Sequence, residues 1–348
     1  MLFRTTVEIE KPQWQIAPAA RMLFVGSCFA DRIGQRFAEE HFPVTVNPYG
    51  VMYNPASVLH TVERLKKEES GIKDYDVAVL TLGTNHVYIE KATGEIVDNC
   101  QKRPQSLFDE QELTVAECAD YLLQTITLLH EWNPAIKIIL TVSPIRYQKY
   151  GFHRSQLSKA TLLLAIEELV KESTSADKSN HNSPLSTLHS SLERDSSLHS
   201  RAELAYPLPF TLHSSLERDS SLHSRAELAY PLPFTLHSSL ERDSSLFTLH
   251  SSLYYFPSYE IVNDELRDYR FYNPDMLHPT DQTVEYIWQR LVETCFSDAA
   301  RQYLEEWRPL KQALAHRPFH PESPEYQQFL RDTQTRIKAF DDKWLKKT

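Results

Sequence analysis

Short apolar runs alternate with amphipathic stretches over the first half of the chain. Uninterrupted apolar runs of a few residues are typical of buried strands, whereas apolar residues at every third or fourth position indicate helices. Strands are therefore predicted at residues 22–25, 43–46, 76–82 and 136–142, and helices at 28–40, 55–67, 114–132 and 157–171. This alternation predicts an α/β fold with three layers, in which helices flank both faces of a mostly parallel sheet.

Local signals indicate where two of these helices begin and where a hairpin lies. Asn54-Pro55 reads as an N-cap followed by proline at the first helical position. Thr114 and Glu117 have the spacing of a capping box. A hairpin is predicted around Ala92-Thr93-Gly94, with strands at 87–90 and 95–98.

A perfect repeat interrupts the pattern. Residues 187–210 recur without a difference at 211–234, and 235–246 repeat the first half of the unit. A folded solenoid needs at least three units, and its repeats differ in sequence from one another. Here fewer than three full copies are present, the copies are identical to one another, and the stretch is rich in Ser and Pro and has no helical period. We therefore predict that residues 173–252 are a disordered low-complexity insert, whose repeated histidines are not metal ligands.

Order is expected to return after the insert. The sequence predicts a strand and turn at 254–260, a short helix at 264–270 and a helix that Thr280-Asp281 caps and that ends near Phe296. The α/β domain then comprises residues 1–172 and 253–300. A helical C-terminal extension follows at 301–348, with a break at 318–324.

Composition narrows the class of protein. A net charge of −10 argues against a nucleic-acid partner, because phosphate binding needs clustered Lys and Arg. No apolar run approaches 18 residues and the N-terminus lacks the pattern of a signal peptide, so neither a membrane span nor secretion is expected. The four cysteines show no C-x-x-C spacing, which favours free thiols in the cytoplasm over a metal site. Neither a metal nor another cofactor is expected.

Candidate chemistry lies at two places far apart in the chain. Ser27 follows the first predicted strand, at the edge where open α/β sheets place their active sites. Asp275 and His278 lie about 250 residues later, spaced so that the carboxylate can orient the imidazole within one turn. Ser, His and Asp are the parts of a nucleophilic hydrolase. The simpler interpretations are that Ser27 only caps a helix and that His278 only packs.

Several motifs in order resemble one family. The strings GSCFA, NPYGVMYNP, TVSPIRY, DMLHP and LAHRPFHPES look like the GSCFA-domain family, which is similar to the SGNH-type esterases and acetylhydrolases. The resemblance covers roughly residues 1–172 and 253–340. It implies an SGNH-type, flavodoxin-like sheet.

The resemblance also implies roles for individual residues. It makes Ser27 the nucleophile, His278 the base and Asp275 the residue that orients the base. The oxyanion would be held by the backbone N–H groups of Ser27 and Gly50 and by the side-chain amide of Asn85. Gly26 directly precedes Ser27, where SGNH enzymes have Gly-Asp-Ser, so this sequence departs from the pattern at the nucleophile and leaves Cys28 as an alternative.

The function expected from these parts is that of a serine esterase or deacetylase. It would release a small acyl group, for which the resemblance suggests acetyl, from an ester on a small molecule or a carbohydrate. His86, Asn99 and Arg146 are candidates for the substrate pocket. An acyltransferase that uses the same site, or a binding protein on the same fold, is the alternative. The sequence leaves the oligomeric state open.

Overall fold

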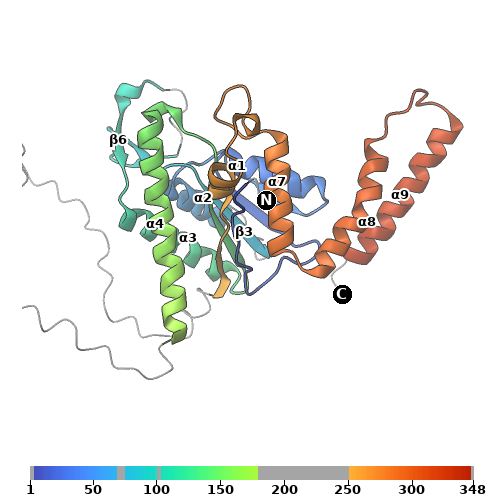
Figure 1. Cartoon of the computed structure of the whole chain (residues 1–348), viewed down its shortest axis with the longest axis horizontal. Helices are drawn as coiled ribbons and strands as arrows, with labels where there is room; N and C mark the ends of the chain where they lie inside the picture. The colour runs from blue at the N-terminus through green and yellow to red at the C-terminus, as the bar shows by residue number, and fades with distance from the viewer. Residues whose placement is uncertain (1–3, 69–74, 99, 101–102, 179–250, 346–348) are drawn as a thin grey trace, which may run out of the picture. The chain divides into compact units, whose positions relative to one another are not determined.

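A five-stranded parallel sheet organises the chain (Figure 1). The computed structural model describes residues 4–68, 75–98, 100, 103–178 and 251–345. The strand order is β2-β1-β3-β7-β8, and every neighbouring pair is parallel. These strands are β1 (Met22–Gly26), β2 (Val44–Val46), β3 (Val77–Leu82), β7 (Lys137–Val142) and β8 (Leu253–Tyr255). The predicted α/β fold with a mostly parallel sheet is confirmed.

Helices cover both faces of the sheet (Figure 1). One face packs against α1 (Cys28–Glu39) and α7 (Asp281–Cys295). The other packs against α2 (Pro55–Glu68), α3 (Val115–Trp132) and α4 (Gly151–Lys178). Successive strand residues point to opposite faces, so Phe24 joins the first core while Leu23 and Val25 join the second. Two apolar cores therefore clamp β1, whose last residue is Gly26.

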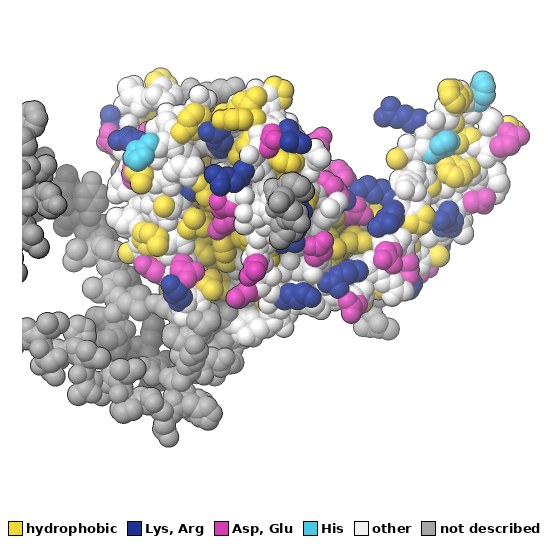
Figure 2. All heavy atoms as spheres, viewed as in Figure 1, with side chains coloured by type: hydrophobic (Ala, Val, Ile, Leu, Met, Phe, Trp, Pro, Cys, Tyr) yellow, Lys and Arg dark blue, Asp and Glu magenta, His cyan; other side chains and the backbone are white. Residues whose placement is uncertain are grey.

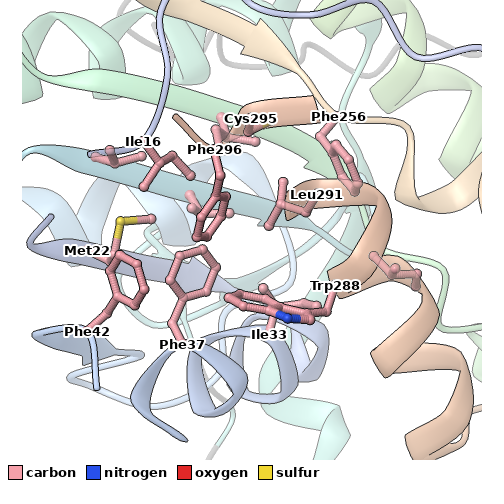
Figure 3. Packing of buried hydrophobic residues seen from close by; sticks show 14 of the residues in the cluster. Ile16, Met22, Ile33, Phe37, Phe42, Phe256, Trp288, Leu291, Cys295 and Phe296 are labelled. Carbon is pink, nitrogen blue, oxygen red and sulfur yellow. The ribbon is translucent and has the colours of Figure 1, made fainter. Parts of the chain in front are cut away.

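Aromatic side chains fix α7 against α1 (Figure 3). Phe37 of α1 is fully buried. Its ring lies 4.8 Å from the ring of Trp288 and 5.7 Å from that of Phe296, with the Trp288 ring edge-on. Such pairs contribute about 1 kcal/mol beyond their buried area. This packing fixes α7 beside α1, the helix that follows the first strand.

A second sheet of three antiparallel strands follows β3. Its order is β5-β4-β6, from β4 (His86–Glu90), β5 (Ile96–Val97) and β6 (Phe108–Glu112). The β4–β5 hairpin was predicted. The sequence did not indicate β6, because its segment FDEQE has one apolar residue and depends on pairing with β4.

Two other elements differ from the prediction. Helix α4 begins at Gly151 and ends at Lys178, so it is longer than 157–171. The helix expected at 264–270 is wrong: a π-helical turn at Ile261–Glu265 and a 3-10 turn at Tyr269–Phe271 stand there instead. Leu266 ends the first turn, and the Asp268 side chain starts the second by accepting the N–H of Arg270.

The C-terminal residues form a pair of helices, α8 (Asp298–Ala315) and α9 (Pro324–Trp344), preceded by the short α6 (Ser258–Glu260) and by α7. The Tyr303 hydroxyl donates to the His41 carbonyl at 2.6 Å, and the Trp307 indole donates to the Glu39 carbonyl at 2.9 Å. These contacts attach α8 to the C-terminal end of α1. Most of the predicted insert, residues 179–250, lies outside the described residues.

The surface drawn in Figure 2 mixes charges of both signs, with magenta and dark-blue side chains side by side. The four cysteines are free thiols, as predicted. In the described part of the chain, no helix is long and apolar enough to cross a membrane. Among the same residues, no cluster of three or more His, Cys, Asp or Glu side chains has the arrangement of a metal site.

Candidate active site

The turn after β1 is built on a glycine that no other residue could replace without strain. Gly26 has φ +144°, and a Cβ placed there would lie 2.1 Å from the carbonyl oxygen of Thr81. β1 and β3 can therefore approach closely only because position 26 lacks a side chain. Ser27 then leaves the sheet, and α1 begins at Cys28.

The side chain of Ser27 points into the protein. Its exposed fraction is 2%. The hydroxyl oxygen caps α1 by accepting the N–H of Phe29 at 3.2 Å, and it shares a hydrogen bond with the Thr81 hydroxyl at 3.0 Å. The predicted nucleophile thus has both of its hydrogen bonds inside the fold, and neither of them reaches His278.

Asp275 and His278 do form the predicted pair. The Nδ1 atom of His278 lies 2.6 Å from Oδ2 of Asp275. The other carboxylate oxygen accepts the backbone N–H groups of Leu277 at 2.8 Å and His278 at 3.0 Å. Met276 takes a positive φ of 58°, which closes the turn.

The hydrogen bonds of this turn set the charge and the tautomer. The backbone N–H groups of His278 and Leu277, followed by the His278 ring, lower the pKa of Asp275 to about 2, so the carboxylate is ionised near neutral pH. A carboxylate at Nδ1 assigns the ring proton to that nitrogen. The Nε2 atom then carries the free lone pair, and none of the described residues occupies it. The side chain of His278 is 42% exposed, so water and a substrate can reach it.

Arg146 secures this turn to the end of β7. Its backbone N–H donates to the Leu277 carbonyl, and its guanidinium donates to the Met276 carbonyl, both at 3.2 Å. The guanidinium also lies 4.1 Å from the centre of the Phe152 ring. Arg146 was predicted to line the pocket, and the structure shows it as the side chain that holds the Asp275–His278 turn.

The three predicted oxyanion donors already have partners inside the fold. The Ser27 N–H donates to the carbonyl and hydroxyl oxygens of Thr81, each at 3.0 Å. The Gly50 N–H donates to the Asn47 carbonyl at 2.8 Å. The Asn85 amide donates to the Leu113 carbonyl at 2.7 Å, and its Oδ1 atom is buried without a partner among the described residues. An oxyanion would have to displace these partners, so the predicted roles stay predictions.

The other two pocket candidates contribute less. His86 is 3% exposed, stacks on the Tyr150 ring at 3.8 Å and bonds Glu110 through Nδ1 at 3.0 Å. Burial lowers the pKa of His86, against the opposing effect of Glu112 and Glu110. The imidazole lies behind Tyr150 and not on an open surface. Asn99 lies outside the described residues.

Two side chains near these loops were not singled out from the sequence. Lys159 of α4 is 2% exposed and donates to the Ser143 carbonyl, just after β7, at 2.8 Å. Burial lowers its pKa to about 7. The neighbouring Ser158 bonds the Asn85 N–H at 2.8 Å. The sequence signal was that Ser155, Ser158 and Lys159 precede the apolar positions on the buried face of α4.

The second missed side chain is Tyr53. Its hydroxyl lies 3.5 Å from the Cys28 sulfur, and its backbone carbonyl accepts the Gly83 N–H at 2.8 Å. Burial, followed by the Cys28 thiol, raises the pKa of Tyr53 well above its usual range. The phenol is therefore neutral and can donate a hydrogen bond.

Comparisons with known proteins match the chain to one family. The sequence model described as the GSCFA family matches residues 21–75, 60–178 and 241–291. A second one, described as the C-terminal domain of GSCFA domain proteins, matches residues 307–346, which span parts of α8 and α9. No curated protein matches the chain.

Proposed function

The chain belongs to the GSCFA family, and from its Asp275–His278 turn we propose that it hydrolyses acyl esters. The proposal rests on the 2.6 Å hydrogen bond between Nδ1 of His278 and Oδ2 of Asp275, which leaves Nε2 of His278 open and solvent-accessible. A carboxylate that orients an imidazole is the general-base half of a nucleophilic hydrolase.

The position of the pair supports the same function. Arg146 follows β7 and binds the carbonyls of Met276 and Leu277, so the pair lies beyond the carboxyl end of a central strand. Open α/β sheets bind their ligands at that edge. Within the described residues, His41–Asp341 and His60–Asp98 also form His–Asp pairs, each with a separation of 2.8 Å. His41 follows the C-terminal end of α1, at the far end of a helix about 18 Å long, so its pair lies away from this edge.

The mechanism assigns one task to each group. His278 accepts a proton through Nε2 from a nucleophile at the beginning of α1, and Asp275 stabilises the imidazolium that results. The nucleophile attacks the ester carbonyl and forms an acyl-enzyme. Protonated His278 then gives its proton to the leaving alcohol, and water releases the acyl group. The small acyl group, acetyl above all, and the carbohydrate acceptor rest on the resemblance to SGNH-type enzymes.

Ester hydrolysis by matched variants tests the proposal. The assay measures kcat/KM for p-nitrophenyl acetate and longer p-nitrophenyl esters. We expect His278→Gln to lower kcat/KM at least about 100-fold, because general-base catalysis contributes 10²–10⁴-fold. Asp275→Asn should lower it at least about 10-fold, because the amide cannot hold the tautomer as an anion does.

His41→Gln is the matched control, because it breaks a His–Asp pair at the other end of α1. It should change kcat/KM less than about twofold. Equal activity of all four proteins would contradict the proposal. A folded wild type that hydrolyses none of these esters would favour a binding protein or an acyltransferase.

A further inference from the structure

The hydroxyl of Ser27 is poorly placed to attack a substrate. A reacting carbonyl must approach its nucleophile to about 3–3.5 Å. The Ser27 side chain is 2% exposed, caps α1 and bonds Thr81. A Cβ at Gly83 would lie 3.5 Å from its Cβ, so the end of β3 covers it as well. Turning the hydroxyl outward would remove the N-cap of α1, which is worth about 1 kcal/mol, and would expose no other group of the side chain.

The next residue is more accessible than Ser27. Cys28 is the first residue of α1, and its side chain is partly exposed. Its sulfur lies 3.5 Å from the Tyr53 hydroxyl, a neutral donor that can stabilise charge on sulfur. The beginning of a helix also favours negative charge, through the aligned dipoles of its peptide groups.

The face of α1 that carries Cys28 is turned toward the segment that holds His278. Residues four apart share a helix face, so Cys28 and Arg32 lie one above the other. Arg32 forms an ion pair with Asp281, the first residue of α7 and three residues beyond His278. The ion pair therefore connects the Cys28 face to the catalytic turn.

A second set of contacts reaches the same turn from the other side. The ring of Tyr53, the partner of Cys28, lies 5.8 Å from the ring of Tyr147. Tyr147 directly follows Arg146, which binds the carbonyls of Met276 and Leu277. These contacts are independent of the α1–α7 ion pair, and the two together place the thiol and the imidazole at one edge.

We propose that the Cys28 sulfur is the nucleophile of the hydrolase described above, on which this inference rests. His278 Nε2 takes the thiol proton, and sulfur forms a bond to the carbonyl carbon while the C=O π electrons move to oxygen. When the carbonyl re-forms, the bond to the ester oxygen breaks and the imidazolium protonates the leaving alcohol. Water then attacks the thioester, His278 accepts a water proton and returns it to the departing sulfur, and the carboxylic acid leaves.

The test compares Cys28→Ala, Cys28→Ser and Ser27→Ala in the same ester assay, with Cys100→Ala as the control. Cys100 is the other partly exposed thiol, whereas Cys118 and Cys295 are buried. We expect Cys28→Ala to lower kcat at least about 100-fold, and Cys100→Ala to keep kcat within about twofold. Ser27→Ala should lose stability through its missing cap and keep most of its kcat.

Chemical labelling gives a readout that a purely structural cysteine would not move. Iodoacetamide should inactivate wild type and Cys100→Ala when Cys28 becomes labelled. It should leave the residual activity of Cys28→Ser unchanged. Cys28→Ser also guards against misfolding, because it replaces only the sulfur atom.

Different results would overturn the Cys28 nucleophile and the ester hydrolase. Full activity in Cys28→Ala together with its loss in Ser27→Ala would overturn this inference and leave an ester hydrolase with a serine nucleophile. A folded wild type that hydrolyses none of these esters, and whose Cys28 reacts with iodoacetamide equally fast with and without ester, would overturn the hydrolase itself.

Discussion

Lys159 provides a prediction whose size follows from its burial. The ammonium is 2% exposed, its hydrogen bond goes to the Ser143 carbonyl, and within the described residues no carboxylate forms an ion pair with it. Burial without a counter-charge disfavours the charged form and lowers the pKa from 10.5 to about 7. Lys159→Met removes the charge and keeps a linear apolar chain.

The sign of the pH effect follows from where each state releases its proton. As the pH rises from 7 towards 10.5 the folded chain releases the Lys159 proton, whereas the unfolded chain still binds it. The unfolded state then holds more protons, so the free energy of unfolding rises with pH. One proton is worth about 1.4 kcal/mol per pH unit, and at pH 7 the folded chain has released only half of it, so wild type should gain about 2 kcal/mol between pH 7 and 9 relative to Lys159→Met.

Urea unfolding at a series of pH values, followed by tryptophan fluorescence, measures this difference. Lys91→Met is the control, because Lys91 is about half-exposed and pairs with Asp109 on the surface at 3.3 Å. The control should follow the wild-type pH curve. If wild type and Lys159→Met gave parallel curves, the lysine would not be buried as a neutral amine and the reasoning would fail.

Three further substitutions test the construction of the site and of one helix. Gly26→Ala should destabilise the chain by about 3 kcal/mol or more in urea unfolding, because its Cβ would meet Thr81; Gly94→Ala, also at positive φ (+73°) but in open space, should cost about 1 kcal/mol, and equal losses would refute the close-approach argument. Arg146→Met should lower kcat about 10-fold or more with little change in melting temperature, because it frees the Asp275–His278 turn; an unchanged kcat would show that this turn keeps its conformation without Arg146. Thr114→Ala should cost about 1 kcal/mol by breaking the capping box, and a loss below the error of the melt would contradict its assignment.

The parallel sheet could be predicted because each of its strands carries its own signal. The segments VAVLTL of β3 and KIILTV of β7 are buried on both faces and read as strands without knowledge of their neighbours. β6 could not be predicted, because a polar edge segment becomes a strand only when β4 is placed beside it.

The same distinction applies to the candidate site. Asp275 and His278 were predicted as a pair because they lie three positions apart, so one turn of the chain decides their contact. The inward orientation of Ser27 depends on Thr81, 54 residues away, and a serine before a helix has the same sequence whether it caps or reacts. The partners of Gly50 and Asn85 are likewise set by tertiary packing, which no local pattern encodes.

The most direct test of the account is to trap the acyl-enzyme. Wild type and His278→Gln are mixed with p-nitrophenyl acetate, quenched in acid within the first turnover, digested and mapped by mass spectrometry. We expect one acetyl group in wild type, on the peptide that contains Cys28 and removable by neutral hydroxylamine as a thioester, and none in His278→Gln. Acetyl groups confined to surface lysines, with equal turnover in the two proteins, would contradict it.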